Sequence, residues 1–387
     1  MVWPKERAEV GMIRSVIALL GRRDTPVDGV EDYCTFLGEG LARRGVNLTR
    51  IRVNWIEQGW LGALRQLRRD SKKWREHLVL LQYTALGWSR HGFPVWAVIV
   101  LGMLRRRGVR TAVVFHEPYR QGERSPRLID RIRGGCQDWV IRKLYDRCKT
   151  PIFVDPVATI RWLPKGDTRS IFVPIGANIP EPAVRSETPT EKLGTTKTVA
   201  IFCLTEPPRM QTEVGDIAFA VRRAASHIPQ MRVIFLGRGT PEAREEIERA
   251  FSDTAVEVRN LGLIGATEIS ETLACADAML CVRGRITPRR GSVMAGVACG
   301  VPIVGYGGAA EATPLAEAGI EFVPHEDREA LGAALTRILE DPGLHASLRE
   351  RSRRAQQKYF SWDAIAASLA ASLGLTTNTI DNVPGRK

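Results

Sequence analysis

The chain contains 387 residues, of which 44% are hydrophobic and 26% are charged. This composition is typical of a soluble globular protein and excludes a largely disordered or collagen-like chain. The length exceeds what one hydrophobic core usually serves, so we expect two domains. A formal net charge of +13 predicts an anionic partner, and charge alone does not choose among nucleic acid, acidic lipid headgroups and phosphorylated substrates.

Cysteine usage and the length of the apolar runs indicate the cellular compartment of the protein. The seven cysteines form no CxxC or Cys/His cluster, so we expect neither a disulfide framework nor a zinc site, and a reducing cytosol fits best. Residues 1–23 carry early charges and only a short apolar run, which does not predict a signal peptide. The longest apolar run, 93–104, is shorter than the ~20 residues that cross a bilayer. We expect a cytoplasmic protein in which 93–104 is a core helix.

Short apolar runs alternate with helix-like segments, which predicts parallel strands joined by helices. The first series of expected strands covers residues 16–20, 48–53, 78–82, 111–115, 151–154 and 170–173. A polar segment with prolines and threonines at 181–197 indicates a linker. The second series covers 198–204, 232–236, 256–261, 278–282, 302–305 and 321–323. Both halves are therefore predicted to be doubly wound α/β domains.

The segment 283–308, RGRITPRRGSVMAGVACGVPIVGYGG, predicts a basic turn, a short helix and a buried strand. Four arginines in the turn supply positive charge, and Gly291 lets a ligand approach the backbone. Ser292 is expected at the N-cap, where free N–H groups would face a phosphate. We predict a diphosphate site here. The alternative is a surface basic turn ahead of an ordinary α/β helix.

Six segments in order resemble the family 4 glycosyltransferases, which have the GT-B fold. In the first half these are the glycine-bearing loop and helix at 26–53, TAVVFHEPY at 111–119 and FVPIGANIP at 172–180. In the second half they are VIFLGRGTPEAREEIE at 233–248, VEVRNLGLIGATEISETLACADAMLCV at 256–282 and ACGVPIVGYGGAAE at 298–311. The resemblance covers most of the chain.

This resemblance implies an α/β protein with two Rossmann-like doubly wound domains facing a cleft. It places an acceptor domain at 1–185, completed by a C-terminal helix at about 358–374, a donor domain at 186–357 and a tail at 375–387. It implies transfer of a hexose from a UDP- or GDP-type nucleotide sugar to a glycan or lipid-linked saccharide in cell-surface polysaccharide synthesis. Retention of configuration, with no metal and no bound cofactor, is also expected.

The same resemblance places candidate site residues at the ends of several expected strands. His116 and Glu117 are expected to be catalytic, and Asp28 and Gly29 to bind the acceptor. The donor-binding candidates are Arg209, Gly237, Arg238, Leu263, Arg285, Arg290, Gly291, Ser292 and Glu311.

Several of these residues have a purely structural alternative. A histidine at a strand end is often a hydrogen-bonded core residue, although ligand sites lie at strand carboxyl ends in this architecture. Arg209 is close in sequence to Glu206 and Glu213, so a surface ion pair is equally expected there. A plain strand-to-helix turn also requires glycines such as Gly237, and Glu311 is also typical of a solvated helix start.

The chain departs from the family at two positions. Aligned on residues 299–302, the family's pair of glutamates falls on Thr287 and Ala295, and neither is an acid. One alternative is therefore a non-catalytic GT-B-like subunit that binds nucleotide or glycan and supports a partner transferase. The arginine-rich turn favours an enzyme, because arginines and a helix N-terminus stabilise charge on a departing diphosphate. A nucleotide-sugar epimerase on the same fold is a further alternative.

A helix predicted at 60–74 carries Trp60, Leu64, Leu67 and Trp74 near one face and basic side chains elsewhere. Such a helix either packs on the first domain or lies on an anionic membrane at the inner face of the plasma membrane, and packing is the simpler expectation. No segment resembles a helix-turn-helix, zinc finger or RNA-recognition sheet, so we expect no nucleic-acid partner.

Overall fold

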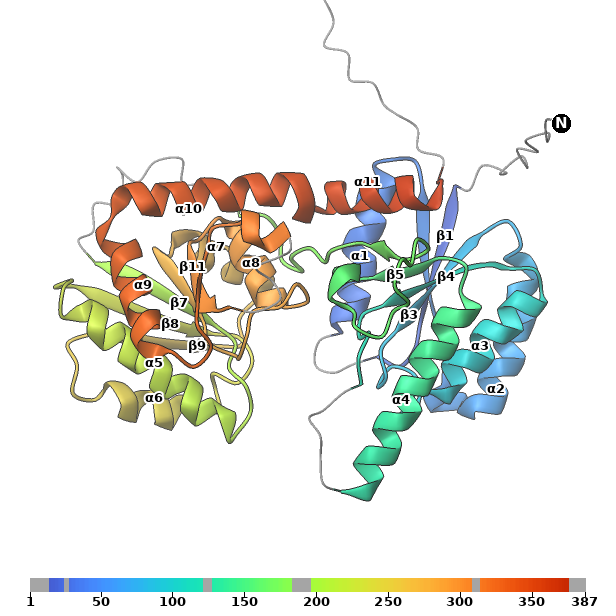
Figure 1. Cartoon of the computed structure of the whole chain (residues 1–387), viewed down its shortest axis with the longest axis horizontal. Helices are drawn as coiled ribbons and strands as arrows, with labels where there is room; N and C mark the ends of the chain where they lie inside the picture. Colours follow the sequence, from blue (N-terminus) through green and yellow to red (C-terminus); the bar gives the residue numbers. More distant parts are fainter. Residues whose placement is uncertain (1–13, 24–27, 121–126, 183–195, 308–313, 376–387) are drawn as a thin grey trace, which may run out of the picture. The chain divides into compact units, whose positions relative to one another are not determined.

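The computed structural model of the chain describes residues 14–23, 28–120, 127–182, 196–307 and 314–375. The chain forms two compact units, the first from Met1–Pro174 with Ile365–Lys387 and the second from Ile175–Ala364. Each unit contains a six-stranded sheet with helices against it (Figure 1). The expected boundary between 185 and 186 falls in the segment 183–195, outside the described residues, and the domain limits stay a prediction.

The sheet of the first unit has the strand order β2-β1-β3-β4-β5-β6, and every pair is parallel. Its central strand β3 is buried along its whole length, as expected for a strand covered by helices on both faces. The strands are β1 (Ser15–Leu20), β2 (Asn47–Arg52), β3 (Leu78–Tyr83), β4 (Arg110–Phe115), β5 (Pro151–Phe153) and β6 (Ile171–Phe172).

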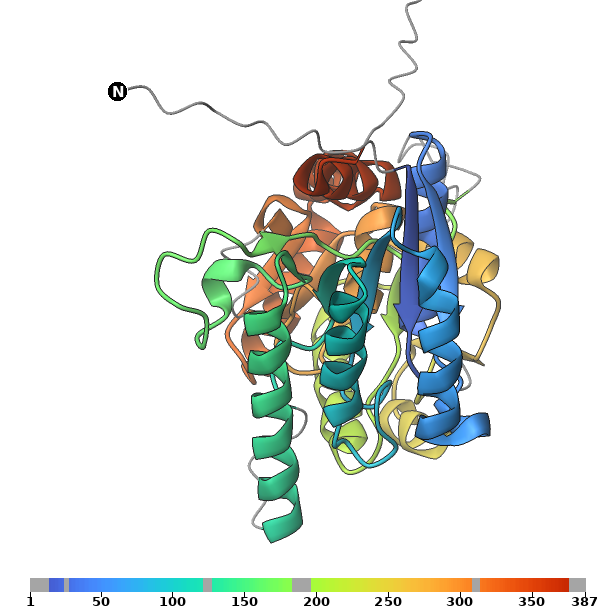
Figure 2. The same cartoon turned by 90° about the vertical axis from the view of Figure 1, so that its right-hand side faces the viewer.

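Helices cover both faces of this sheet. The connection from β1 to β2 runs in the opposite direction from those that lead to β3, β4 and β5, so right-handed crossovers place α1 on one face and α2, α3 and α4 on the other. These three lie side by side in Figure 2. The helices are α1 (Gly29–Ala42), α2 (Trp55–Asp70), α3 (Val95–Arg106), α4 (Leu128–Arg147) and, from residue 365 onward, α11 (Trp362–Leu373).

The second unit repeats this architecture with the order β12-β11-β10-β7-β8-β9, again with parallel pairs only. Its strands are β7 (Lys197–Phe202), β8 (Met231–Leu236), β9 (Glu257–Gly262), β10 (Ala278–Cys281), β11 (Ile303–Tyr306) and β12 (Ile320–Val323). Its helices are α5 (Arg209–Ala225), α6 (Arg244–Phe251), α7 (Ala266–Cys275), α8 (Gly291–Cys299), α9 (Arg328–Glu340) and α10 (Pro342–Ala355).

Both predicted series of strands are present, and the predicted fold class is confirmed. No strand end differs from its expected position by more than two residues. A π-helical turn (Gln356–Phe360) separates α10 from α11. Most of the expected linker at 181–197 and nearly all of the expected tail at 375–387 lie outside the described residues.

The predicted helix at 60–74 packs inward. Trp60 stacks between Trp55 and Trp96, with ring centroids 4.9 Å apart in each pair. Leu67 and Trp74 are buried in the core of the first unit. The apolar face of α2 is thus occupied by protein, and the simpler expectation is confirmed. The run at 93–104 likewise forms the core helix α3. Among the described residues, no helix is both long and apolar enough to cross a membrane.

His345 on α10 is expected to make the stability of the second unit depend on pH. Its Nε2 donates to the backbone oxygen of Asp277, 3.0 Å away. Burial lowers the pKa of His345 below its usual value, and the nearby charge of Arg349 lowers it further. The folded state therefore favours the neutral ring, and the unfolded chain binds a proton more readily. We expect the unfolding temperature to fall as the pH drops below about 6.5, the pKa of an unperturbed histidine.

The substitution His345→Gln tests this expectation, because a glutamine amide can still donate to Asp277 but does not titrate. Thermal unfolding measured between pH 8 and pH 5 should decline less steeply for the variant. Equal slopes for the two proteins would show that His345 does not contribute to the acid sensitivity.

Candidate functional site

Three loops follow the carboxyl ends of neighbouring strands β10, β7 and β8 in the second sheet. They cover residues 282–290, 203–208 and 237–243. Ligands of open parallel sheets bind beyond the carboxyl ends of the strands, where loops and helix N-termini converge. This edge also carries most of the expected donor-binding residues, so the search for a site begins here.

A chain of hydrogen bonds joins the loop after β10 to the loop after β7. Arg283 Nε donates to Thr205 Oγ1 at 3.3 Å. The Thr205 hydroxyl donates in turn to Glu213 of α5, and the Thr205 amide donates to Glu213 Oε2 at 2.8 Å. Glu213 is only 5% exposed. The buried carboxylate fixes Thr205, and Thr205 holds the Arg283 guanidinium at the end of the sheet.

Arg290 is the most unusual side chain of this edge. Its Nη1 is buried and donates to no group in the described part of the chain. Burial lowers the pKa of the guanidinium below its usual value, and the charges of Arg283 and Arg289 act in the same direction. An arginine nevertheless stays protonated at neutral pH. A buried cation with an unsatisfied donor is costly, and an anionic ligand would relieve that cost.

Cys281 at the end of β10 does not neutralise this charge. Burial raises the pKa of its thiol to about 12, in spite of the opposing influence of Arg290 and Arg283. The thiol is therefore uncharged at neutral pH. Glu213 is the buried acid of the cluster, and it stands against two arginines, Arg283 and Arg290.

The N-terminus of α8 adds backbone donors beside Arg290. Arg290 occupies the N-cap, and no side chain caps the helix. The first intrahelical bond runs from the Val293 amide to Arg290 O at 3.0 Å, so the amides of Gly291 and Ser292 precede it. No atom lies within 4 Å of the position that a Cβ on Gly291 would take. The helix end thus leaves room for an anion, which its dipole favours.

The expected position of Ser292 was wrong. The helix begins at Gly291, so Ser292 lies in the first turn, and its side chain is buried. The predicted order of basic turn, short helix and buried strand is confirmed, because α8 and β11 follow residues 283–290.

The other expected donor-binding residues lie along the same edge. Arg209 begins α5 and is exposed, as are Arg238 after β8 and Arg285 in the basic turn. Leu263 follows β9 and is 64% exposed. Glu311 lies outside the described residues. Donor contacts by any of these residues stay a prediction.

The backbone conformation and the packing of the loop after β8 explain why glycine occupies positions 237 and 239. Both have positive φ, at 89° and 81°. A Cβ on Gly237 would lie 2.7 Å from Cys203 Sγ, and one on Gly239 would lie 2.4 Å from Leu204 O. The loop after β8 therefore packs against the end of β7 in a way that only glycine allows.

His116 and Glu117 follow β4 in the first unit, also at the carboxyl ends of strands. His116 Nε2 lies 2.8 Å from Gln82 Oε1, and the ring of Tyr33 meets the imidazole edge-on at 5.0 Å. Glu117 Oε2 accepts from the Ala85 amide at 3.0 Å. Each side chain is held by a hydrogen bond, and the catalytic role of both residues stays a prediction.

Asp28 has a clear structural role as the N-cap of α1. Its Oδ1 accepts from the amides of Val30 and Glu31, at 3.1 and 3.0 Å. Arg52 lies 3.6 Å from its other oxygen. Gly29, the first residue of α1, has open space where a Cβ would be. Acceptor binding by Asp28 and Gly29 stays a prediction.

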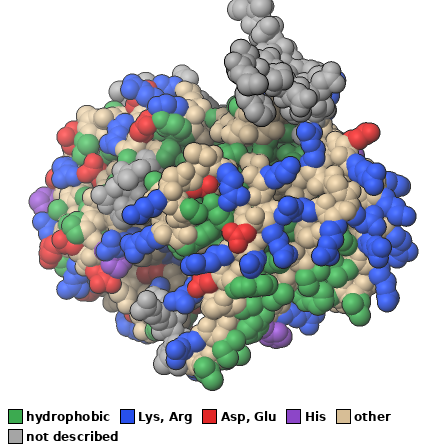
Figure 3. All heavy atoms as spheres, turned by 45° about the vertical axis from the view of Figure 1, so that its right-hand side comes forward, with side chains coloured by type: hydrophobic (Ala, Val, Ile, Leu, Met, Phe, Trp, Pro, Cys, Tyr) green, Lys and Arg blue, Asp and Glu red, His purple; other side chains and the backbone are tan. Residues whose placement is uncertain are grey.

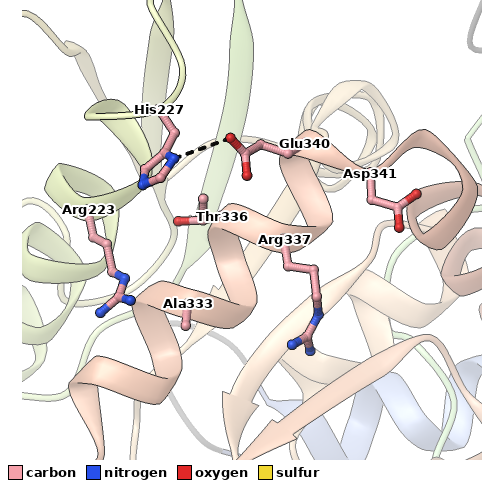
Figure 4. A pocket seen from close by; sticks show the side chains of 7 residues that line it. All are labelled: Arg223, His227, Ala333, Thr336, Arg337, Glu340 and Asp341. Carbon is pink, nitrogen blue, oxygen red and sulfur yellow. Dashed lines mark ion pairs between the residues drawn. The ribbon is translucent and has the colours of Figure 1, made fainter.

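A surface hollow of about 320 Å³ lies between the C-terminal ends of α5 and α9 (Figure 4). It is at the amino edge of the sheet, because α5 starts after the carboxyl end of β7. Its three basic side chains are paired: Arg223 with Glu329, Arg337 with Glu321 and His227 with Glu340. These charges are compensated, so the hollow is not an anion site comparable to the one at Arg290.

The positions that lack the family's glutamates differ in their surroundings. Thr287 is half-buried in the basic turn, whereas Ala295 is buried in the apolar core behind α8. Among the described residues, no three acidic, histidine or cysteine side chains form a group that could hold a metal ion.

Thr205 and Glu213 are site residues that the sequence did not single out for this role. Eight residues separate Thr205 from Glu213, and Glu213 lies about one turn into α5, so their spacing in the sequence is only a weak signal for a contact. Arg283 was expected to bring charge to the turn, but its anchoring to Thr205 becomes visible only in the structure.

The two doubly wound parallel sheets and the position of this site define the GT-B fold. No protein-family model and no curated protein sequence matches the chain. Solved structures do match. The sucrose-phosphate synthase of Thermosynechococcus elongatus is 18% identical, with 93% of this chain and 98% of that chain covered and a TM-score of 0.67.

Two further structures show how widely the fold is used. Anabaena HepE in complex with UDP and glucose is 16% identical, with 94% and 100% of the two chains covered and a TM-score of 0.63. A putative UDP-N-acetylglucosamine 2-epimerase from Listeria monocytogenes is 11% identical, with 93% and 95% covered and a TM-score of 0.61. At such identities these structures establish the fold of this chain.

Proposed function

We propose that the chain is a glycosyltransferase that moves a hexose from a nucleoside diphosphate sugar to a glycan or lipid-linked acceptor. The observation that carries the proposal is the half-buried Arg290, whose Nη1 is buried and has no partner among the described residues, beside the uncapped N-terminus of α8. A diphosphate supplies the charge and the acceptor oxygens that this pair lacks. The HepE structures with UDP and with UDP-glucose support a nucleotide of this class.

In the proposed reaction, the bond between the sugar C1 and the diphosphate oxygen breaks and its electron pair stays on the diphosphate. Arg290, Arg283 and the amides of Gly291 and Ser292 then stabilise the charge that develops on the leaving group. Because these arginines and amides stabilise the leaving group, we propose that no metal ion is required. Retention of configuration rests on the family resemblance alone.

The acceptor oxygen forms the new bond to C1, and its proton must leave. We propose that His116 accepts this proton. Because Gln82 Oε1 accepts from Nε2, the neutral ring presents Nδ1 as its acceptor atom. Glu117 would act beside it as a second polar contact to the acceptor.

The second candidate is a non-catalytic subunit that binds the nucleotide or a glycan and supports a partner transferase. The absence of acids at Thr287 and Ala295 favours it. A nucleotide-sugar epimerase is the third candidate, because one of the similar structures is named as a putative UDP-N-acetylglucosamine 2-epimerase.

Calorimetric titration with UDP, GDP, ADP, dTDP and their common sugar conjugates, with and without Mg²⁺, tests the proposal. We expect metal-independent binding of one nucleotide class. When an acceptor is present, we expect release of the nucleoside diphosphate from the nucleotide sugar. Binding without turnover across an acceptor panel would favour the non-catalytic subunit. Conversion of the nucleotide sugar without any acceptor would favour an epimerase. No binding across the panel would contradict a nucleotide-sugar site.

A further inference from the structure

The outer face of α4 carries large apolar side chains that no part of the described chain covers. Leu128 is 70% exposed, Ile132 is 54% exposed and Trp139 is 47% exposed. Their spacing of four and seven residues places them along one stripe of the helix. Ile129 in the first turn is also exposed. We call these four residues the α4 stripe.

The rest of α4 is an ordinary packed helix. Val140, Ile141, Leu144 and Tyr145 are buried in the core of the first unit. Gly135 lies between Ile132 and Trp139 on the same helix, is exposed, and has open space at the position that a Cβ would take. The N-terminal half of α4 extends beyond α3 in Figure 2. The N-terminal part of the α4 stripe thus protrudes from the unit, and all four of its side chains are exposed.

Positive charge borders the α4 stripe. Arg131 and Arg142 are exposed, and Lys143 is half-buried. No carboxylate of the described chain pairs with these three side chains. On the face shown in Figure 3, apolar side chains form a band across the lower part of the surface, and lysines and arginines lie along its border. The band reaches the lowest part of the view, where α4 begins.

The net charge of the molecule is concentrated in the same unit. Residues 1–174 and 365–387 contain 34 Lys and Arg against 18 Asp and Glu, whereas residues 175–364 contain 22 against 25. The first unit therefore has a formal charge of +16 and the second a charge of −3. Such an asymmetry favours an extended anionic surface as the partner of the first unit, rather than the bound nucleotide alone.

We propose that the α4 stripe and the cations at its border dock the protein on an anionic lipid bilayer. The apolar side chains enter the boundary between headgroups and acyl chains, where a tryptophan is favoured, and the arginines remain among the lipid phosphates. The apolar face of α2 is packed against the core of the first unit, so the proposed membrane contact is made by α4 instead. The proposal does not depend on the function of the second unit, and it brings the protein to the surface on which a lipid-linked acceptor would be found.

Co-sedimentation with vesicles tests the proposal. The full-length protein is mixed with vesicles of phosphatidylcholine alone or of phosphatidylcholine with 30% phosphatidylglycerol. We expect binding to the anionic vesicles, weaker binding to the neutral ones, and partial loss at high salt. The double variant Ile132→Glu, Trp139→Glu should lower the partition coefficient by about tenfold or more, because it removes apolar burial and adds repulsion.

The matched control is Ala42→Glu with Thr49→Glu. It changes the net charge of the same unit by the same amount at exposed positions of α1 and of the edge strand β2, away from α4. This variant should keep at least half of the vesicle binding. Titration with the nucleotide that the wild type binds, together with thermal unfolding, checks that both variants are folded; binding should be unchanged because the altered residues lie in the first unit.

Three outcomes would overturn the proposal: no wild-type binding to anionic vesicles, equal loss for the two double variants, or a dimer in sedimentation velocity that only the α4 variant dissociates. The last would assign the α4 stripe to a second copy of the chain. Trp139→Phe gives an independent readout. The wild-type minus variant fluorescence spectrum should shift to shorter wavelength on adding anionic vesicles, and an unshifted spectrum would contradict insertion of Trp139.

Discussion

Replacement of Arg290 by alanine is expected to weaken binding of the nucleoside diphosphate by about 10- to 100-fold. A hydrogen bond to a charged group contributes about 1.5–3 kcal/mol, and about 1.4 kcal/mol corresponds to a factor of ten in affinity. The guanidinium has a buried Nη1 without a partner among the described residues, so the free protein loses no hydrogen bond from that atom in the variant. Calorimetric titration with UDP and GDP measures the effect directly.

The thermal stability of the Arg290→Ala variant should equal or exceed that of the wild type, because the change removes a buried donor that has no partner among the described residues. Arg337→Ala is the matched control. It removes one positive charge from the same unit at the amino edge of the sheet, where Arg337 pairs with Glu321 at 2.6 Å. Unchanged nucleotide affinity in Arg290→Ala, or an equal loss in Arg337→Ala, would remove Arg290 from the proposed site.

Gly319→Ala is expected to destabilise the second unit by about 3 kcal/mol, at the upper end of the usual cost of overpacking. A Cβ on Gly319 would lie 1.9 Å from Leu348 O and 2.6 Å from Leu348 C, both backbone atoms of α10. The Gly319 amide also donates to Ser352 Oγ at 3.0 Å, and Ser352 is fully buried. The added methyl group must push α10 away from the sheet, because neither backbone can yield by a rotamer change.

Gly215→Ala provides the contrasting control. Gly215 lies inside α5, and no atom lies within 4 Å of its Cβ position. Alanine should therefore stabilise this helix by about 0.5–1 kcal/mol. Thermal unfolding should show opposite shifts for the two variants, and equal shifts would contradict the packing of Gly319 against α10.

The strands were predictable because parallel sheets bury both faces of their strands. Runs such as those of β1 and β3 are apolar at nearly every position, as expected for strands that are covered on both faces. The alternation of these strands with helices then predicted the doubly wound fold class. The position of each helix start was less predictable, because a cap depends on local backbone geometry. The sequence suggested Ser292 as the N-cap, whereas the structure has Arg290 there.

The candidate site was predictable in place but not in detail. Strand ends and arginines indicated the carboxyl edge of the second sheet. Sequence spacing does not show that Arg290 has a buried Nη1 without a partner among the described residues, or that Glu213 anchors Arg283 through Thr205. These facts depend on how α5, β10 and α8 pack. For the same reason the apolar faces of α2 and α4 were not distinguishable as buried and exposed until both helices were placed on the sheet.

The return of α11 to the first unit determines the order in which the protein can be completed during synthesis. Its buried residues Ile365, Ala366, Leu369 and Ala370 belong to the first unit, although 190 residues of the second unit separate them from Pro174. The ribosome therefore releases the whole second unit before the last helix of the first unit emerges. A truncation before residue 365 removes part of the N-terminal unit, and that unit, although made first, reaches its final structure last.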